Sequence, residues 1–207
     1  MADMLPLRAS TLAGQILPAT RPRSALLRNL ALAVAGSLLM VAAAKIKVPF
    51  WPVPMTLQTL AVLALGAAYG PRLGAATIAL YVAYGLAGLP VFTNTPPLAA
   101  GPLYLAGPTG GFILGFVIAA AVAGWAAARG ASLVRLLGGL LLADLALMVV
   151  GCLWLAFGAQ MAGGATGVGL AKAFAYGVQP FLLGEALKTA LAASLVGAGW
   201  SLLGRRG

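Results

Sequence analysis

The chain has 207 residues, of which 62% are hydrophobic and only 8% are charged. A soluble domain has about a quarter of its residues charged, so this composition excludes an ordinary soluble protein. It predicts an all-α integral membrane protein. The length suits one bundle of about six membrane-spanning helices, at about 20 apolar residues each.

The formal net charge of the chain is +10. Basic chains often bind nucleic acid, but here most basic residues flank apolar runs, where they act as topology signals, and no basic run is interleaved with aromatic residues. We therefore expect the lipid bilayer, and no nucleic acid, to surround this protein.

The chain has no histidine and one cysteine, Cys152, which lies in an apolar run. These counts exclude a disulfide framework and remove the commonest metal ligand and general base. No carboxylate cluster and no nucleophile–base arrangement replaces them. We therefore expect no catalytic residue, no metal site and no cofactor in this chain, and so no enzyme.

Residues 1–25 mix proline, serine, threonine and arginine, which predicts a loose cytoplasmic lead before one transmembrane domain over 26–207. The six predicted spans cover about 26–46, 55–69, 72–89, 109–128, 133–157 and 179–203. The end of the first span, "VAAAK", also resembles a signal-peptide cleavage site. The lead is long for a signal peptide, however, and an uncleaved helix makes the later topology consistent.

The connections between these spans are distinctive. The segment "IKVPFWPVP" at 46–54 has three prolines, which prevent a regular helix. The short second span ends at "YGPR", where Gly70 and Pro71 predict a tight turn. Two long loops follow later, at 89–108 and at the Gly-rich 158–178.

The arginines predict the orientation. With a cytoplasmic N-terminus, all of them fall in inside segments, and the outside segments hold only Lys45, Lys47 and Lys172. Because basic residues concentrate on the cytoplasmic side of membrane proteins, we expect both termini to be cytoplasmic and the two long loops to face outward with the proline-rich segment.

Two charges interrupt the last predicted span. Glu185 and Lys188 stand three residues apart, so both side chains share one helix face. A charge near mid-bilayer costs about 2.5–3.5 kcal/mol on insertion scales, and such residues usually serve function. They would suit an outward-opening site for a small molecule that carries its own carboxylate and N–H groups. Alternatively, the two form an ion pair that locks the bundle, or Lys188 pairs with Asp144 of the fifth span.

Four stretches carry a family resemblance. They are "VPFWPVPMTLQTLAVLALGAAYGPRLGA", "YGLAGLPVFTN", "GPTGGFILGF" and "PFLLGEALK". Together they resemble the BioY family, the biotin-specific substrate-capture subunits of energy-coupling-factor (ECF) transporters. The resemblance covers nearly all of residues 30–200, in the same order and with similar spacing.

The resemblance implies a multi-pass, six-helix bundle in the bacterial cell (inner) membrane that binds biotin near its outer face. It also implies partners, namely a transmembrane coupling protein and two ATP-binding-cassette ATPase subunits. The chain contains no loop of the type G-x-x-x-x-G-K-[ST], so ATP would be used by those partner subunits.

Carried over residue by residue, the resemblance implies a biotin site built from the last helix and two other segments. The family's acidic-x-x-Lys motif falls on Glu185 and Lys188, although the family usually has Asp in place of Glu185. The family's Asn after "PVF" falls on Asn94, here after an intervening Thr93, and the "TLQT" motif places Gln58 on the second span.

These residue types suit biotin, which has a cyclic urea, a thioether ring and an apolar chain that ends in a carboxylate. An amide can donate to and accept from a urea, and a carboxylate can accept its N–H groups. Lys188 can bind either the urea oxygen or the distant carboxylate. The apolar parts need a hydrophobic wall, for which the candidates are Phe50, Trp51, Tyr81, Tyr84, Phe92 and Tyr104. Trp51 lies in the proline-rich outer segment, which could close over the site.

A second site is implied on the first span. Ala31 and Ala35 stand four residues apart, and close helix approach needs small side chains. The resemblance implies that this Ala-x-x-x-Ala patch docks on the coupling protein, while packing within the bundle would explain the pattern almost as well.

Two other functions remain open at this point. One is a self-sufficient carrier, in which Glu185 takes up a proton and couples its movement to the solute. The other is a structural membrane scaffold, in which the charged pair only fixes the assembly.

Overall fold

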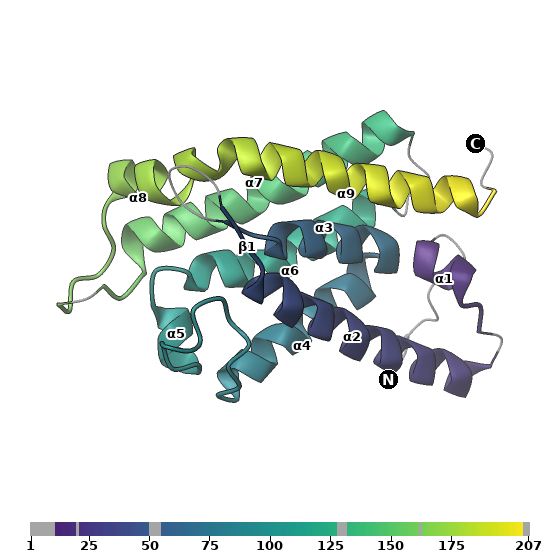
Figure 1. Cartoon of the computed structure of the whole chain (residues 1–207), viewed down its shortest axis with the longest axis horizontal. Helices are drawn as coiled ribbons and strands as arrows, with labels where there is room; N and C mark the ends of the chain where they lie inside the picture. The colour runs from purple at the N-terminus through teal and green to yellow at the C-terminus, as the bar shows by residue number, and fades with distance from the viewer. Residues whose placement is uncertain (1–10, 20, 50–54, 128–131, 162, 205–207) are drawn as a thin grey trace.

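The computed structural model describes residues 11–19, 21–49, 55–127, 132–161 and 163–204. These residues are mostly helical, and the long helices α2, α7 and α9 run roughly along the long axis of the molecule (Figure 1). The α-helices are α1 (Leu12–Ile16), α2 (Pro22–Lys45), α3 (Gln58–Tyr69), α4 (Pro71–Leu86), α5 (Pro102–Ala106), α6 (Gly110–Ala127), α7 (Leu133–Phe157), α8 (Leu170–Gly177) and α9 (Leu182–Leu202). A short 3-10 helix, η1 (Gln179–Phe181), precedes α9, and β1 (Lys47–Val48) pairs antiparallel with β2 (Met55–Thr56).

A helix lies in each of the six predicted spans, so the positions of α2, α3, α4, α6, α7 and α9 are confirmed. Four stretches are long and apolar enough to cross a membrane, namely α2, α6, α7 and Leu170–Leu202, which includes α9. Helix α3 is apolar but shorter, with 12 residues. The sequence pattern therefore locates the helices, while the number of membrane crossings stays a prediction.

Helices α3 and α4 meet in the tight turn that "YGPR" predicts. Gly70 adopts a φ of +83°, which residues with a side chain rarely adopt, and Pro71 begins α4. The turn folds the two short helices back on each other. Together they place the N-terminal end of α3 deep in the bundle, beside α9.

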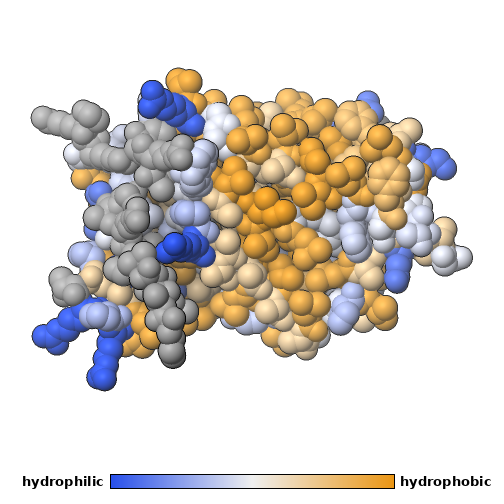
Figure 2. All heavy atoms as spheres, turned by 180° about the vertical axis from the view of Figure 1, so that it is seen from behind, coloured by the Kyte–Doolittle hydropathy of each residue, from blue (hydrophilic) through white to orange (hydrophobic). Residues whose placement is uncertain are grey.

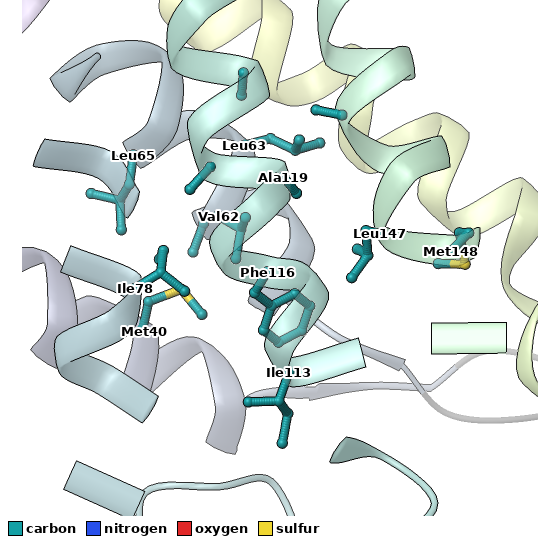
Figure 3. Close-up of a cluster of buried hydrophobic side chains, with 14 of the residues drawn as sticks. Met40, Val62, Leu63, Leu65, Ile78, Ile113, Phe116, Ala119, Leu147 and Met148 are labelled. Atoms are coloured by element: carbon teal, nitrogen blue, oxygen red, sulfur yellow. The ribbon is translucent and has the colours of Figure 1, made fainter. Parts of the chain in front are cut away.

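Helix α6 lies at the centre and contacts α3, α4 and α7. Small residues permit this arrangement, since a Cβ on Gly66 of α3 would lie 2.5 Å from the carbonyl oxygen of Ala120 in α6. Figure 3 shows the apolar side chains that fill the space around α6. They are Met40, Val62, Leu63, Leu65, Ile78, Ile113, Phe116, Ala119, Leu147 and Met148.

The outward faces of the long helices are apolar too. Figure 2 shows a broad hydrophobic band across the middle of one face, with hydrophilic residues toward the two ends of the molecule. Large exposed side chains of α2, α7 and α9 include Leu30, Leu38, Leu145, Leu187 and Leu195. Exposed apolar surface of this extent is typical of contact with lipid.

The N-terminal lead is not loose along its whole length, and that part of the prediction is wrong. Residues Leu12–Ile16 form α1, which packs against α3 and α9. The hydroxyl of Thr11 caps this helix by accepting from the backbone N–H of Gly14 at 3.1 Å. The guanidinium of Arg28 then donates to the carbonyl oxygen of Leu17 at 2.7 Å, which ties the segment to α2.

The Gly-rich loop 158–178 also contains structure that the sequence pattern did not indicate. Its last part forms α8, whose Ala173 is buried against the bundle, and α8 packs on α7. Helix α5 likewise lies within the predicted loop 89–108.

Helix α2 belongs to the packed bundle, which argues against a removable signal peptide. It packs on α4 and α3, and its Met40 and Ala44 side chains are fully buried. Removing α2 would expose this part of the core.

Candidate functional site

The charged residues of the last helix form an ion pair inside the bundle. Glu185 and Lys188 lie in the first two turns of α9 and are only 5% and 8% exposed. The ammonium Nζ of Lys188 is 2.5 Å from Oε1 of Glu185. The pair therefore has the mutual contact that its spacing of three residues predicts.

The N-terminal end of α3 completes the surroundings of this pair. Nζ of Lys188 donates to the hydroxyl of Thr59 at 3.3 Å and to the backbone carbonyl of Thr56 at 3.4 Å. The Thr59 hydroxyl in turn donates to Oε1 of Glu185 at 3.3 Å. All three N–H donors of the ammonium are thus used, and one carboxylate oxygen of Glu185 is saturated.

A second polar network begins one residue away, at Gln58. The amide Nε2 of Gln58 donates to the hydroxyl of Tyr81 at 3.0 Å. Its oxygen Oε1 accepts from the hydroxyls of Thr93 at 2.7 Å and Thr56 at 3.1 Å. Because Thr56 also contacts Lys188, the two networks are continuous. They join α3, α4, α9 and the loop after α4, which covers residues 87–101.

The aromatic residues of this region stack on one another. The ring of Phe92 lies between Tyr104, at a centroid distance of 4.8 Å and nearly parallel, and Tyr81, at 5.6 Å and edge-on. Gly85 leaves room for Phe92, since a Cβ there would overlap the ring. Both Phe92 and Tyr81 have no exposed surface. In the structure these rings hold the loop after α4 against the bundle.

Two lysines, Lys45 at the end of α2 and Lys47 in β1, contact the same loop. Nζ of Lys45 donates to the carbonyl oxygens of Phe92, at 2.6 Å, and Thr95. Lys47 donates to the side-chain oxygen of Asn94 at 3.5 Å. Asn94 is exposed, and this contact does not bring it to Glu185 or Lys188. Its role in binding stays a prediction.

The second acidic side chain of the described residues, Asp144, faces the same place from α7. It is 8% exposed and interacts electrostatically with both Glu185 and Lys188. The salt bridge of Lys188 among the described residues is nevertheless with Glu185. The structure thus brings together Glu185, Lys188, Gln58, Tyr81 and Phe92 of the predicted site. Trp51 and Phe50 lie outside the described residues.

Ala31 and Ala35 lie on the outer face of α2. Both are exposed, whereas Ala33 and Gly36 point into the bundle. Packing within the bundle therefore does not explain the Ala-x-x-x-Ala spacing, and the patch is available to another helix or to lipid.

Sequence reasoning missed the threonines. Thr56 and Thr59 lie on either side of Gln58 in the "TLQT" motif, and this proximity to a predicted site residue could have indicated their role. Thr93 precedes Asn94, another predicted site residue. Among the described residues no group of three histidine, cysteine or acidic side chains is placed to hold a metal ion.

Comparison with known proteins identifies the fold family. The profile of the BioY family matches residues 14–205, which is most of the chain. The chain belongs to the BioY family. A probable biotin transporter BioY from Pyrococcus horikoshii is 36% identical over 149 residues, 72% of this chain and 82% of that protein. Biotin transporter BioY2 from Lactococcus lactis subsp. cremoris is 32% identical over 171 residues, 80% of this chain and 86% of that protein.

The structures agree with this family membership. The crystal structure of an S-component for biotin from an ECF-type ABC transporter matches with a TM-score of 0.68, covering 91% of this chain and 96% of that one. The two sequences are 21% identical, so the likeness shows a shared fold. Like other members of the BioY transporter family, this chain with its several long apolar helices is a multi-pass membrane protein.

Proposed function

We propose that this BioY-family chain is the biotin-binding membrane subunit of an ECF-type importer. It captures biotin at the outer face and delivers it inward together with a separate ATP-driven module. Relatives that match most of their length are described as biotin transporters, and the matching solved fold is a biotin S-component. The proposed substrate comes from the names of these relatives, and the proposed binding contacts come from the residues of the site.

The observation that carries the proposal is the buried Glu185–Lys188 pair with one carboxylate oxygen left over. Oε2 of Glu185 is buried and accepts no hydrogen bond from an N–H or hydroxyl group of the described residues, and the Asp144 side chain lies at hydrogen-bond distance from the Glu185 side chain. A buried acceptor of this kind costs about 1–3 kcal/mol or more, which a ligand N–H group can recover. The urea of biotin offers such N–H groups. Its carbonyl or carboxylate would bind the Lys188 ammonium by replacing the backbone carbonyl of Thr56, because all three N–H groups of Lys188 are used in the free protein.

The proposed orientation has six crossings with both termini in the cytoplasm. Arg21 and Arg28 flank the start of α2, Arg72 follows the α3–α4 turn, and Arg135 lies in the first turn of α7. Figure 1 shows α1 and the C-terminal end of α9 at one end of the bundle, with α5 and α8 at the other. These basic clusters and the positive-inside rule support a cytoplasmic position for the α1 end. The Glu185 site then lies nearer the outer face.

The energy would come from partners. The sequence has no phosphate-binding loop of the Walker type, so we assign ATP hydrolysis to two ATP-binding-cassette subunits and their transmembrane coupling protein. The exposed Ala31–Ala35 patch on α2 is the proposed docking surface, because small side chains allow close helix contact.

A proton-coupled carrier is the second candidate, favoured by the two buried acids Asp144 and Glu185. Proteoliposomes that contain only this chain separate the two functions. We expect them to bind labelled biotin without accumulating it under an imposed proton gradient. Accumulation driven by the gradient, without ATP or partner subunits, would establish the carrier instead.

A further inference from the structure

Lys45, the last residue of α2, has no salt bridge among the described residues, and its ammonium binds the backbone instead. Nζ of Lys45 donates to the carbonyl oxygens of Phe92, at 2.6 Å, and Thr95. It also lies 3.5 Å from the hydroxyl of Thr95. Hydrogen bonds from a charged donor are stronger than those from a neutral one, so this contact is a strong link between α2 and the loop after α4.

The turn that receives this ammonium, residues 92–95, is buried. Phe92 has no exposed surface and Thr95 is 1% exposed. The hydroxyl and the backbone N–H of Thr95 both donate to the carbonyl of Phe92, at 2.8 and 3.2 Å. Among the described residues, however, the carbonyl of Thr95 accepts only from Lys45. Removing the ammonium would leave this buried carbonyl unsatisfied, which is unfavourable, so the turn would be expected to shift.

The same turn carries a contact of the candidate site. The hydroxyl of Thr93 donates to Oε1 of Gln58 at 2.7 Å. In the chain Thr93 lies between Phe92 and Thr95, whose carbonyls Lys45 binds. The position of the Thr93 hydroxyl therefore depends on how Lys45 holds the turn.

The second hydroxyl on Gln58 is supported from the same end of α2. Thr56 donates to Oε1 of Gln58 at 3.1 Å, and its backbone pairs with Lys47, two residues after Lys45. With both hydroxyls on its oxygen, Gln58 directs its amide Nε2 toward the hydroxyl of Tyr81, at 3.0 Å. The end of α2 thus supports both contacts that set the orientation of the Gln58 amide.

We propose that Lys45 is a positioning residue of the biotin site, which acts through Thr93 on the orientation of the Gln58 amide. This assignment rests on the proposed function, with Gln58 as a residue of the site. An amide held in one orientation offers a ligand a fixed pattern of donor and acceptor. An amide free to rotate must be ordered when the ligand binds, which weakens binding. Lys45 contributes to affinity in this way without contacting biotin.

A positioning role has a different consequence from a purely structural one. A lysine that only stabilised the fold would, when replaced, lower the melting temperature but leave the affinity of the folded protein unchanged. A positioning lysine changes the affinity of the folded protein. If it acts through Thr93, the size of that change also depends on the Thr93 hydroxyl.

The experiment measures equilibrium binding of labelled biotin to purified protein in detergent, well below the melting temperature of each variant. The proteins are the wild type, Lys45→Met, Lys45→Arg, Thr93→Val and the double variant Lys45→Met/Thr93→Val. Methionine removes the ammonium, whereas arginine keeps the charge and the N–H donors. We expect Lys45→Met to bind biotin about tenfold more weakly, and Lys45→Arg to recover most of that loss. Lys172→Met, at an exposed position of α8, is the control and should bind as the wild type.

The double variant provides the decisive comparison. It should bind biotin within about twofold of Lys45→Met, because the contact between Thr93 and Gln58 is already lost in the single variant. If Lys45→Met does not fold, Lys45→Gln, which keeps an N–H donor without the charge, replaces it in both proteins and should show the same dependence on Thr93.

Three results would overturn the assignment of Lys45. They are wild-type affinity in the folded Lys45→Met protein, no recovery by Lys45→Arg, and losses that multiply in the double variant. Failure of the wild type to bind biotin would instead overturn the proposed function, and the assignment of Lys45 with it.

Discussion

Thr59 and Lys188 meet across the interface of α3 and α9, where the ammonium donates to the threonine hydroxyl at 3.3 Å. The same hydroxyl donates to Glu185 at 3.3 Å. The Thr59 hydroxyl thus accepts a hydrogen bond from a buried cation and donates one to a buried anion. This contact joins residues 129 positions apart in sequence and fixes how α9 presents its charges.

Thr59→Val tests this positioning. Valine has nearly the shape of threonine but removes the hydroxyl, so Lys188 and Glu185 each lose a partner. We expect the free energy of unfolding to fall by about 1–3 kcal/mol and biotin binding to weaken. Thermal unfolding and equilibrium binding in the same detergent measure the two effects.

Thr77→Val is the matched control for that change. Thr77 is also buried, and its hydroxyl donates within α4 to the carbonyl of Leu73 at 2.7 Å. It should leave biotin affinity unchanged. If Thr77→Val and Thr59→Val weaken binding to the same extent, the loss reflects general loosening of the bundle.

Gly85→Ala tests whether the aromatic stack holds the loop after α4. An added Cβ would overlap the ring of Phe92, and overpacking of this kind costs about 1–3 kcal/mol. We expect a lower melting temperature and faster release of biotin, because Phe92 and the adjacent Thr93 must shift away from Gln58.

The control for Gly85→Ala is Gly138→Ala on α7, where a Cβ meets no atom within 4 Å. Alanine is a better helix former than glycine, so this variant should be as stable as the wild type or more so. A Gly85→Ala protein that behaves in the same way would show that Phe92 adapts without consequence.

The alanine patch makes a prediction about assembly. Ala31→Leu combined with Ala35→Leu enlarges two exposed side chains on α2, which should leave biotin binding intact but prevent co-purification with a coupling protein and its ATPases. Ala190→Leu, on the exposed side of α9, is the control. Normal co-purification of the double variant would remove the patch as the docking surface.

Much of the fold could be predicted from the sequence, because long apolar runs and Gly–Pro punctuation depend on local residues alone. Helix α7 begins and ends at the predicted residues, and Gly70–Pro71 makes the predicted turn. Helix α1 could not be predicted from periodicity, because its five residues are too few to show a helical pattern; Thr11 caps it, and contacts with α3 and α9 hold it against the bundle.

The site was predictable to the extent that charges are rare in this chain. Glu185 and Lys188 are conspicuous in an apolar helix, and the structure pairs them. Thr59 was not conspicuous, since threonine is common in membrane helices and its role depends on the docking of α3 against α9. The intervening Thr93 also changes which side chain reaches Gln58. The Thr93 hydroxyl donates to Gln58, while Asn94 is exposed and contacts Lys47.

Equilibrium binding of labelled biotin to Lys188→Met protein tests the central claim most directly, with Lys172→Met as the control because Lys172 is an exposed lysine on α8. We predict that the wild type and Lys172→Met bind biotin alike, and that folded Lys188→Met binds at least about tenfold more weakly. Wild-type affinity in the Lys188→Met protein would contradict the assignment of this buried pair as the biotin site.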